Sequence, residues 1–146
     1  MSKAGARAMI AHEVIVQADP ETVFSLYENI ESWPRWDEEV AAVSLPDGLR
    51  ENAQGWLQPR SGPRAKIQVV SVNRPFQFSV ESQLPGCKMG FDHRIEATTL
   101  GTRVTHGVYF KGATSFVFAR LIGPLLNRGL PLTLQGLKRE AEAMTK

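Results

Sequence analysis

Through the middle of the chain, hydrophobic residues alternate with polar ones, which is the period of strands that bury one face. The first such segment covers Ile10–Val16. From Glu39 onward the alternation returns between turns that contain Gly or Pro. It predicts further strands at residues 55–60, 66–72, 76–83, 89–97 and 104–110. The chain is therefore expected to form about six to seven strands.

Two short helical elements should follow the first strand. Asp19 is a good N-cap and Pro20 suits the first helical position, so a helix is expected over residues 20–28. A second element should begin at the Trp33-Pro34-Arg35-Trp36 segment, because Pro34 disfavours helix at Trp33.

The last segment, residues 116–144, changes to a helical period and predicts a long helix with one apolar stripe. Pro124 and Pro131 interrupt this stripe, so we expect kinks. Strands in a run followed by a helix favour the α+β class with an antiparallel sheet. The final helix is the only element large enough to cover the apolar face of that sheet. Residues 1–9 are interpreted as a flexible tail, and 10–146 as one domain.

Composition narrows the function classes. The 146 residues carry a net charge of +2, with Lys and Arg scattered among acids, so nucleic-acid binding is not expected. Cys87 is the only cysteine, which excludes an internal disulfide and suits a reducing compartment. We expect no signal peptide, because no apolar segment follows Lys3 and Arg7, and no membrane-spanning helix, because no apolar run approaches about 20 residues. We expect a cytoplasmic protein without stable membrane insertion, either monomer or homodimer.

Four stretches resemble the START-like, or SRPBCC, superfamily, in a bacterial branch related to polyketide cyclases and dehydrases. The stretches are residues 18–24 followed by 33–36, residues 55–63, residues 92–96 with 101–106, and residues 129–142. The resemblance covers the chain from about Ile10 to its end. It implies a helix-grip fold, in which a curved antiparallel sheet wraps around a long C-terminal helix and encloses an apolar pocket.

The strand faces indicate what would line such a pocket. Phe78, Phe91 and Phe110 each lie on the apolar face of a predicted strand, and Leu126 lies on the apolar stripe of the helix. Trp33 and Trp36 are further candidates, with one expected in the core and one at the rim. A pocket of this kind would take a lipid, a polyketide or an isoprenoid-like compound.

His93 and His106 also lie on apolar strand faces. If Leu100-Gly101 is the hairpin turn, His93 pairs with Val108, and the histidines become diagonal neighbours about 7–8 Å apart. His12 is in phase with Val14 and Val16, near the open end of its strand. Burial and mutual repulsion should keep at least one of the pair neutral below the usual pKa of about 6.5.

Three roles remain open for the His93 and His106 pair: a buried structural contact, a ligand contact, or acid–base catalysis. The pair has no third partner for a metal ion, so neither metal nor cofactor is expected. The leading hypothesis is reversible binding of a hydrophobic small molecule. The alternatives are an enzyme of the polyketide cyclase/dehydratase type, using these histidines for proton transfer, and a regulatory domain whose pocket is incidental.

Overall fold

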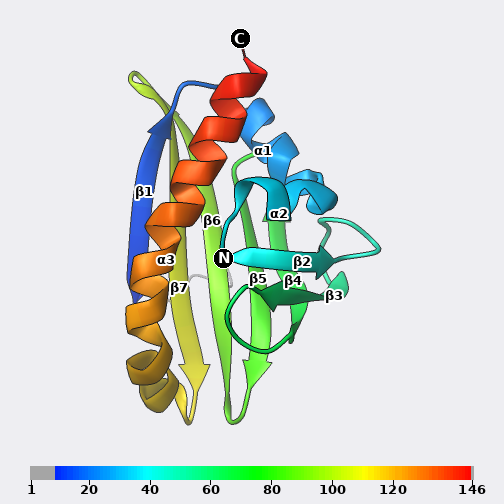
Figure 1. The fold of residues 1–146 in the computed structure, drawn as a ribbon, viewed down its shortest axis with the longest axis vertical. Helices are drawn as coiled ribbons and strands as arrows, with labels where there is room; N and C mark the ends of the chain where they lie inside the picture. Colours follow the sequence, from blue (N-terminus) through cyan, green and yellow to red (C-terminus); the bar gives the residue numbers. More distant parts are fainter. Residues whose placement is uncertain (1–8, 146) are drawn as a thin grey trace.

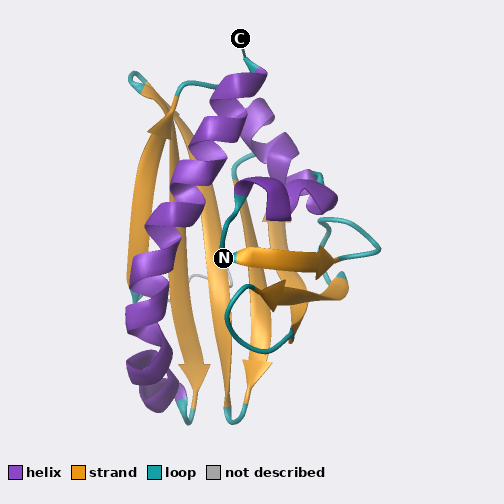
Figure 2. Ribbon diagram, viewed as in Figure 1, coloured by secondary structure: helices purple, strands orange, loops and turns teal. Residues whose placement is uncertain are grey.

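The computed structural model describes residues 9–145, and most of the predicted tail, residues 1–8, lies outside the described residues. Seven strands form one antiparallel sheet in the order β1-β7-β6-β5-β4-β3-β2. All the helices lie on one face of it (Figure 2). The α+β helix-grip prediction is therefore confirmed. The strands are β1 (Ile10–Val16), β2 (Val40–Ser44), β3 (Gln54–Pro59), β4 (Ala65–Asn73), β5 (Gln77–Leu84), β6 (Cys87–Thr98) and β7 (Gly101–Gly112).

The predicted first helix is confirmed at both ends as α1 (Pro20–Glu28), with Pro20 in its first turn. The Asp19 carboxylate caps it by accepting a hydrogen bond of 2.8 Å from the Thr22 amide. A 3-10 turn, η2 (Ile30–Ser32), leads directly into α2 (Trp33–Trp36). Trp33 is nevertheless helical, because Pro34 falls in the first turn of α2, where its missing N–H is not needed.

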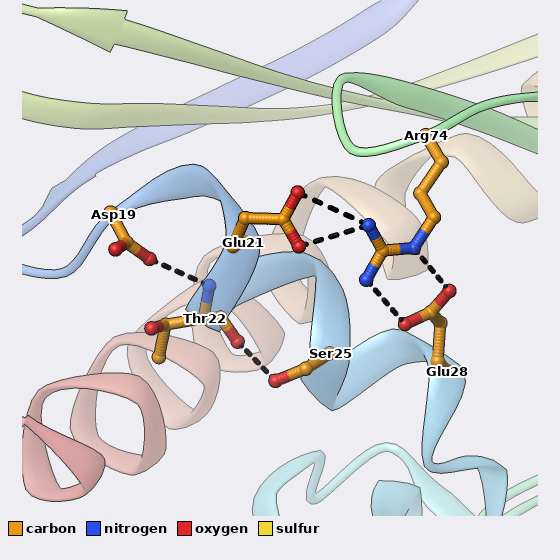
Figure 3. Close-up of polar contacts among 6 residues, drawn as sticks. All are labelled: Asp19, Glu21, Thr22, Ser25, Glu28 and Arg74. Carbon is orange, nitrogen blue, oxygen red and sulfur yellow. Dashed lines mark hydrogen bonds and ion pairs between the residues drawn. The ribbon is translucent and has the colours of Figure 1, made fainter.

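Arg74, in the turn between β4 and β5, fixes α1 to the sheet (Figure 3). Its guanidinium donates to Glu28 at 2.7 and 3.0 Å and to Glu21 at 2.9 and 3.1 Å. The two carboxylates raise the pKa of Arg74 further above its usual value. Because Glu21 and Glu28 stand two turns apart on α1, this one side chain contacts both ends of the helix.

The last helix, α3 (Ser115–Met144), runs unbroken through Pro124 and Pro131. It lies across β1 and β7, while α1 and α2 cover the other side of the same face (Figure 1). Gly136 allows α3 to approach α2 closely, because a Cβ there would collide with the main-chain carbonyl oxygen of Trp36.

The buried side chains on the concave face form two clusters, which divide this face into two halves. The packed half lies beneath α1, α2 and the C-terminal part of α3, and it includes Phe24, Tyr27, Phe78, Leu134 and Leu137. The open half lies beside the N-terminal part of α3. Its buried members are Cys87, Val108, Phe110 and Leu130, and its other members are only partly buried: Ile10, Leu84, Met89, Phe91, Phe118, Ala119, Ile122 and Leu126.

The β6–β7 hairpin turns one residue earlier than the sequence predicted. Thr98 pairs with Gly101, so Thr99 and Leu100 form the loop. The Thr98 hydroxyl fixes this turn by donating to the Gly101 carbonyl and accepting from the Leu100 amide. The predicted pairing of His93 with Val108 is therefore wrong.

Candidate functional site

In the observed register, His93 of β6 lies directly opposite His106 of β7. His106 in turn lies opposite His12 of β1, and His93 lies opposite Phe78 of β5. Directly opposite residues of an antiparallel pair point to the same face. All three histidines of the chain therefore form one row with Phe78 across four neighbouring strands, on the concave face.

Tyr27 reaches this row from α1. Its hydroxyl lies 2.6 Å from Nε2 of His106, and both residues are buried. The His93 ring stacks on Phe78, with centroids 3.9 Å apart and an interplanar angle of 4°. The two imidazoles meet edge to face at 4.7 Å. Tyr27, His93 and His106 thus form one contiguous polar cluster, which we call the Tyr–His–His cluster.

The Tyr–His–His cluster is uncharged at neutral pH. Burial lowers the pKa of His106 well below its usual value, and the neighbouring His93 lowers it further. Burial also lowers the pKa of His93 to about 4, although its hydrogen bond and Asp92 oppose the shift. Burial raises the pKa of the Tyr27 phenol, and the Asp37 carboxylate adds to this. The prediction that at least one histidine stays neutral well below its usual pKa is therefore supported for both.

The hydrogen bonds define which nitrogen of His93 is available. Its Nδ1 lies 3.1 Å from the main-chain carbonyl oxygen of Phe78, which can only accept. Nδ1 therefore carries the proton, and the neutral ring has Nε2 as its acceptor. His12 is placed differently, because its Nε2 lies 2.7 Å from the side-chain oxygen of Asn127 on α3, in an exposed position.

Beside the cluster, three successive inward-facing residues of β6 remain partly exposed: Met89, Phe91 and His93. We call them the β6 strip. β6 is an interior strand of the sheet, between β7 and β5. Its cover is incomplete here because α3 packs mainly on β1 and β7. Met89 and Phe91 pack against the open half, where Leu126 of α3 is also partly buried.

The structure brings some of the predicted ligand residues together and separates others. Phe91, His93 and Leu126 are partly exposed near the open half, and Phe110 is buried within it. Phe78 and His106 are buried in the floor. The prediction that one of Trp33 and Trp36 lies at a rim is wrong: both are buried. Their indole N–H groups donate to the Tyr27 carbonyl and to the Ser32 hydroxyl, which ties them into the core.

Two hollows in the described part of the chain lie away from the β6 strip. One is at the end of the sheet, beside Phe76 and Arg94. The other is on the outer face, between Lys66, Glu81 and Lys88. The enclosed pocket predicted from the sequence is not among them. The candidate site is instead the partly covered strip beside the Tyr–His–His cluster.

Sequence reasoning missed Tyr27 as a site residue. Its helical spacing with Val23 and Phe24 marks it only as part of the buried face of α1. A signal was present, because a buried tyrosine hydroxyl needs a hydrogen-bond partner, and the chain offers two histidines on apolar faces. What the sequence does not give is the angle at which α1 crosses the sheet, and this decides which histidine the hydroxyl meets.

A seven-stranded antiparallel sheet that grips a long C-terminal helix places the chain in the START-like class of folds. Within it, the chain belongs to the polyketide cyclase/dehydrase and lipid transport family, whose sequence profile matches residues 7–142. No curated protein matches the chain in sequence. Among residues 9–145, no helix combines the length and hydrophobicity that crossing a membrane requires.

Solved structures show the same fold at low sequence identity. The di-domain aromatase/cyclase StfQ of the steffimycin pathway has a TM-score of 0.75 at 11% identity, over 93% of this chain and 51% of that one. This chain thus spans about half of StfQ. Norcoclaurine synthase from Thalictrum flavum, solved with a transition-state analogue, gives 0.73 at 12% identity over 97% and 98%. TTHA0849 from Thermus thermophilus gives 0.72 at 16% identity over 94% and 99%.

Proposed function

We propose that this protein binds an apolar small molecule, such as a lipid, a polyketide or an isoprenoid-like compound, on the concave face between the sheet and α3. The observation that carries the proposal is the β6 strip. Met89, Phe91 and His93 face inward on a central strand, yet no part of the described fold covers them fully. A ligand bound there would cover the exposed parts of these side chains.

Apolar burial supplies the driving force. Each Å² of apolar surface removed from water contributes about 25 cal/mol, so covering about 300 Å² gives on the order of 7 kcal/mol before association costs. Phe91, Met89 and the partly buried Leu126 are the proposed contacts. Trp33, Trp36 and Phe78 are already covered by protein, so we assign them a supporting role beneath the site.

His93 provides the polar contact in this proposal. Its Nε2 is an acceptor, because Nδ1 is committed to the Phe78 carbonyl. A ligand hydroxyl could donate to it and so be oriented against the apolar wall. Because the pKa of His93 is lowered to about 4, the ring stays neutral and does not favour an anionic ligand. The family description, which names lipid transport, supports an apolar ligand, and the single cysteine supports a cytoplasmic setting.

A polyketide cyclase or dehydratase activity is the second candidate, and the Tyr–His–His cluster favours it. A neutral phenol within 2.6 Å of one neutral imidazole, with a second imidazole beside it, can both donate and accept a proton. In this reading His93 would touch the substrate, because it is the partly exposed member. Tyr27 and His106 would set its orientation and take part in proton transfer.

Dye binding tests the β6 strip directly. The protein should bind an apolar dye such as anilinonaphthalene sulfonate, and Phe91→Glu should weaken that binding at least tenfold by placing a charge on the strip. Phe76→Glu is the matched control, because Phe76 is an exposed phenylalanine in the turn before β5, at the hollow that lies away from the β6 strip. Equal dye binding by both variants, or none by the unmodified protein, would contradict the proposal.

His93→Asn separates the two candidates. If the site only binds, the change should alter affinity modestly. If it catalyses, turnover of a poly-β-ketothioester mimic should fall about 100-fold while the mimic still binds. Mass spectrometry of the mimic follows its loss of water. No conversion by the unmodified protein would remove the enzyme hypothesis for this substrate class.

A further inference from the structure

The outward face of α3 carries a stripe of apolar side chains that nothing in the described structure covers. Val117, Leu121, Leu125 and Leu132 recur at helical spacing, and Phe116 lies beside them. Their exposed fractions run from 43% for Leu132 to 69% for Phe116. The opposite side of the same helix packs on the sheet, so this part of α3 is apolar both inward and outward.

The charges along this stripe are all positive. Arg128 follows Leu125 by three residues and so lies on the stripe, and the Arg120 guanidinium lies 5.5 Å from the Phe116 ring centroid. Neither arginine forms an ion pair within residues 9–145. The sequence contains no Asp or Glu from Ala97 to Arg139. Two acids from the segment after α2 contact α3 near buried positions: Glu39 lies against the buried Gly129, and Asp37 accepts a hydrogen bond from the buried Thr133.

The exposed apolar side chains and the arginines together indicate what kind of partner this stripe binds. A second copy packed two-fold on the stripe would bring Arg120 and Arg128 toward the same residues of its partner with no acid between them. Residues 1–8, which lie outside the described structure, contain Lys3, Arg7 and only one large apolar residue, Met1. An anionic lipid surface instead accepts both features, since headgroup charge attracts the arginines and the acyl boundary accepts the apolar side chains.

We propose that this apolar–basic stripe docks the protein reversibly on an anionic lipid surface. The docking is peripheral: the helix lies in the interface and does not cross the bilayer. The inference rests on the outward face of α3 and is independent of ligand binding at the β6 strip. Together the two would let the protein collect or deliver its ligand at a membrane, because the open half lies on the opposite side of the same helix.

Vesicle co-sedimentation tests the proposal on the full chain. The protein should bind vesicles of phosphatidylcholine containing about one-third phosphatidylglycerol and not vesicles of phosphatidylcholine alone, and binding should weaken with added salt. The pair Leu121→Glu with Leu125→Glu should reduce binding at least tenfold. Arg120→Gln with Arg128→Gln should reduce it about tenfold or more on anionic vesicles.

Leu100→Glu is the matched control, because Leu100 is as exposed as Leu121 but lies in the β6–β7 loop. It should bind vesicles like the unmodified protein. Circular dichroism checks folding, and Leu121→Ser with Leu125→Ser replaces the Glu pair if that pair unfolds. Dye binding at the β6 strip should survive in the stripe variants.

Three results would overturn the proposal. One is absence of binding to anionic vesicles, and another is equal loss in the Leu100→Glu control. The third is a dimer in sedimentation that dissociates on the Leu121 and Leu125 changes, because the stripe would then be an interface between copies.

Discussion

The two halves of the concave face share four strands, β1, β5, β6 and β7, but the helices cover them differently. In the packed half, aromatic residues from α1 and α2 interlock with the sheet, as in the edge-to-face contact of Phe24 with Phe78 at 5.9 Å. In the open half, α3 alone supplies cover, and it crosses β1 and β7 rather than β6. The alternating pattern of a strand therefore fixes which face is apolar, whereas the helices decide how much of that face is available to a ligand.

The largest expected difference in stability between the two halves is at two leucines of α3. Leu134 is fully buried in the packed half, whereas Leu126 is partly buried in the open half. Leu134→Ala should lower the free energy of unfolding by about 2–5 kcal/mol, and Leu126→Ala by less than half as much. Urea denaturation measures both. Equal losses would show that the two halves are packed alike.

A second test uses two glycines of α3. Gly136→Ala should cost about 1–3 kcal/mol, because the new methyl group meets the Trp36 carbonyl oxygen and must push α2 and α3 apart. At Gly123 the added carbon would meet Ile10 at an ordinary 3.6 Å. Gly123→Ala should therefore be neutral or stabilising, by up to about 1 kcal/mol. Thermal unfolding distinguishes the two, and a stable Gly136→Ala would contradict close packing in that half.

The stability of the protein should depend on pH through His93 and His106. Both histidines have lowered pKa values, so the unfolded chain takes up protons first as the pH falls. Stability should therefore fall as the pH drops from about 6.5 toward 4, by up to about 1.4 kcal/mol per pH unit for each histidine. His106→Gln should flatten this slope in urea titrations at several pH values. The carboxylates are the same in both proteins and cancel in the difference. An unchanged slope would mean that His106 is not buried.

The smallest effect is expected at Arg74, outside both halves. Its ion pairs with Glu21 and Glu28 are exposed, so Arg74→Gln should change stability less than any substitution above. The effect should shrink further in high salt. Arg94→Gln serves as the comparison, because the ion pair of Arg94 is with Asp92 of its own strand and not with α1. A large loss specific to Arg74→Gln would mean that the position of α1 depends on this clamp.

Local rules predicted the elements better than the site. The limits of α1 followed from Asp19 and Pro20, since cap and ring chemistry act within one turn. The alternation also placed His93 and His106 on the concave face. The pairing was shifted because a threonine hydroxyl, and not the glycine, fixes the β6–β7 turn. Moving the turn by one residue changes the partner of every residue in the hairpin, so His93 and His106 lie directly opposite each other and not diagonally.

Two features could not be predicted from the sequence: which residue contacts the histidines, and how far the helices cover the apolar face of the sheet. Tyr27 is 79 residues from His106, and their contact depends on how α1 crosses the sheet. The exposure of Phe91 depends on which strands α3 crosses, which is settled by close contacts such as Gly136 against Trp36. These are tertiary distances, and no periodicity along one strand or helix encodes them.

The C-terminal part of α3 is more deeply buried than its N-terminal part, and this difference affects where the helix unfolds locally. A terminal helix commonly frays from the chain end, but here the C-terminal part carries Leu134, Leu137 and Ala141, all fully buried. The weakly held part begins at Ser115, in the interior of the sequence. Amide hydrogen exchange along α3 should therefore be fastest in its first turns and slowest toward residue 141, the reverse of ordinary end-fraying. The cover that α3 provides should therefore loosen first beside the open half and stay fixed beside the packed half.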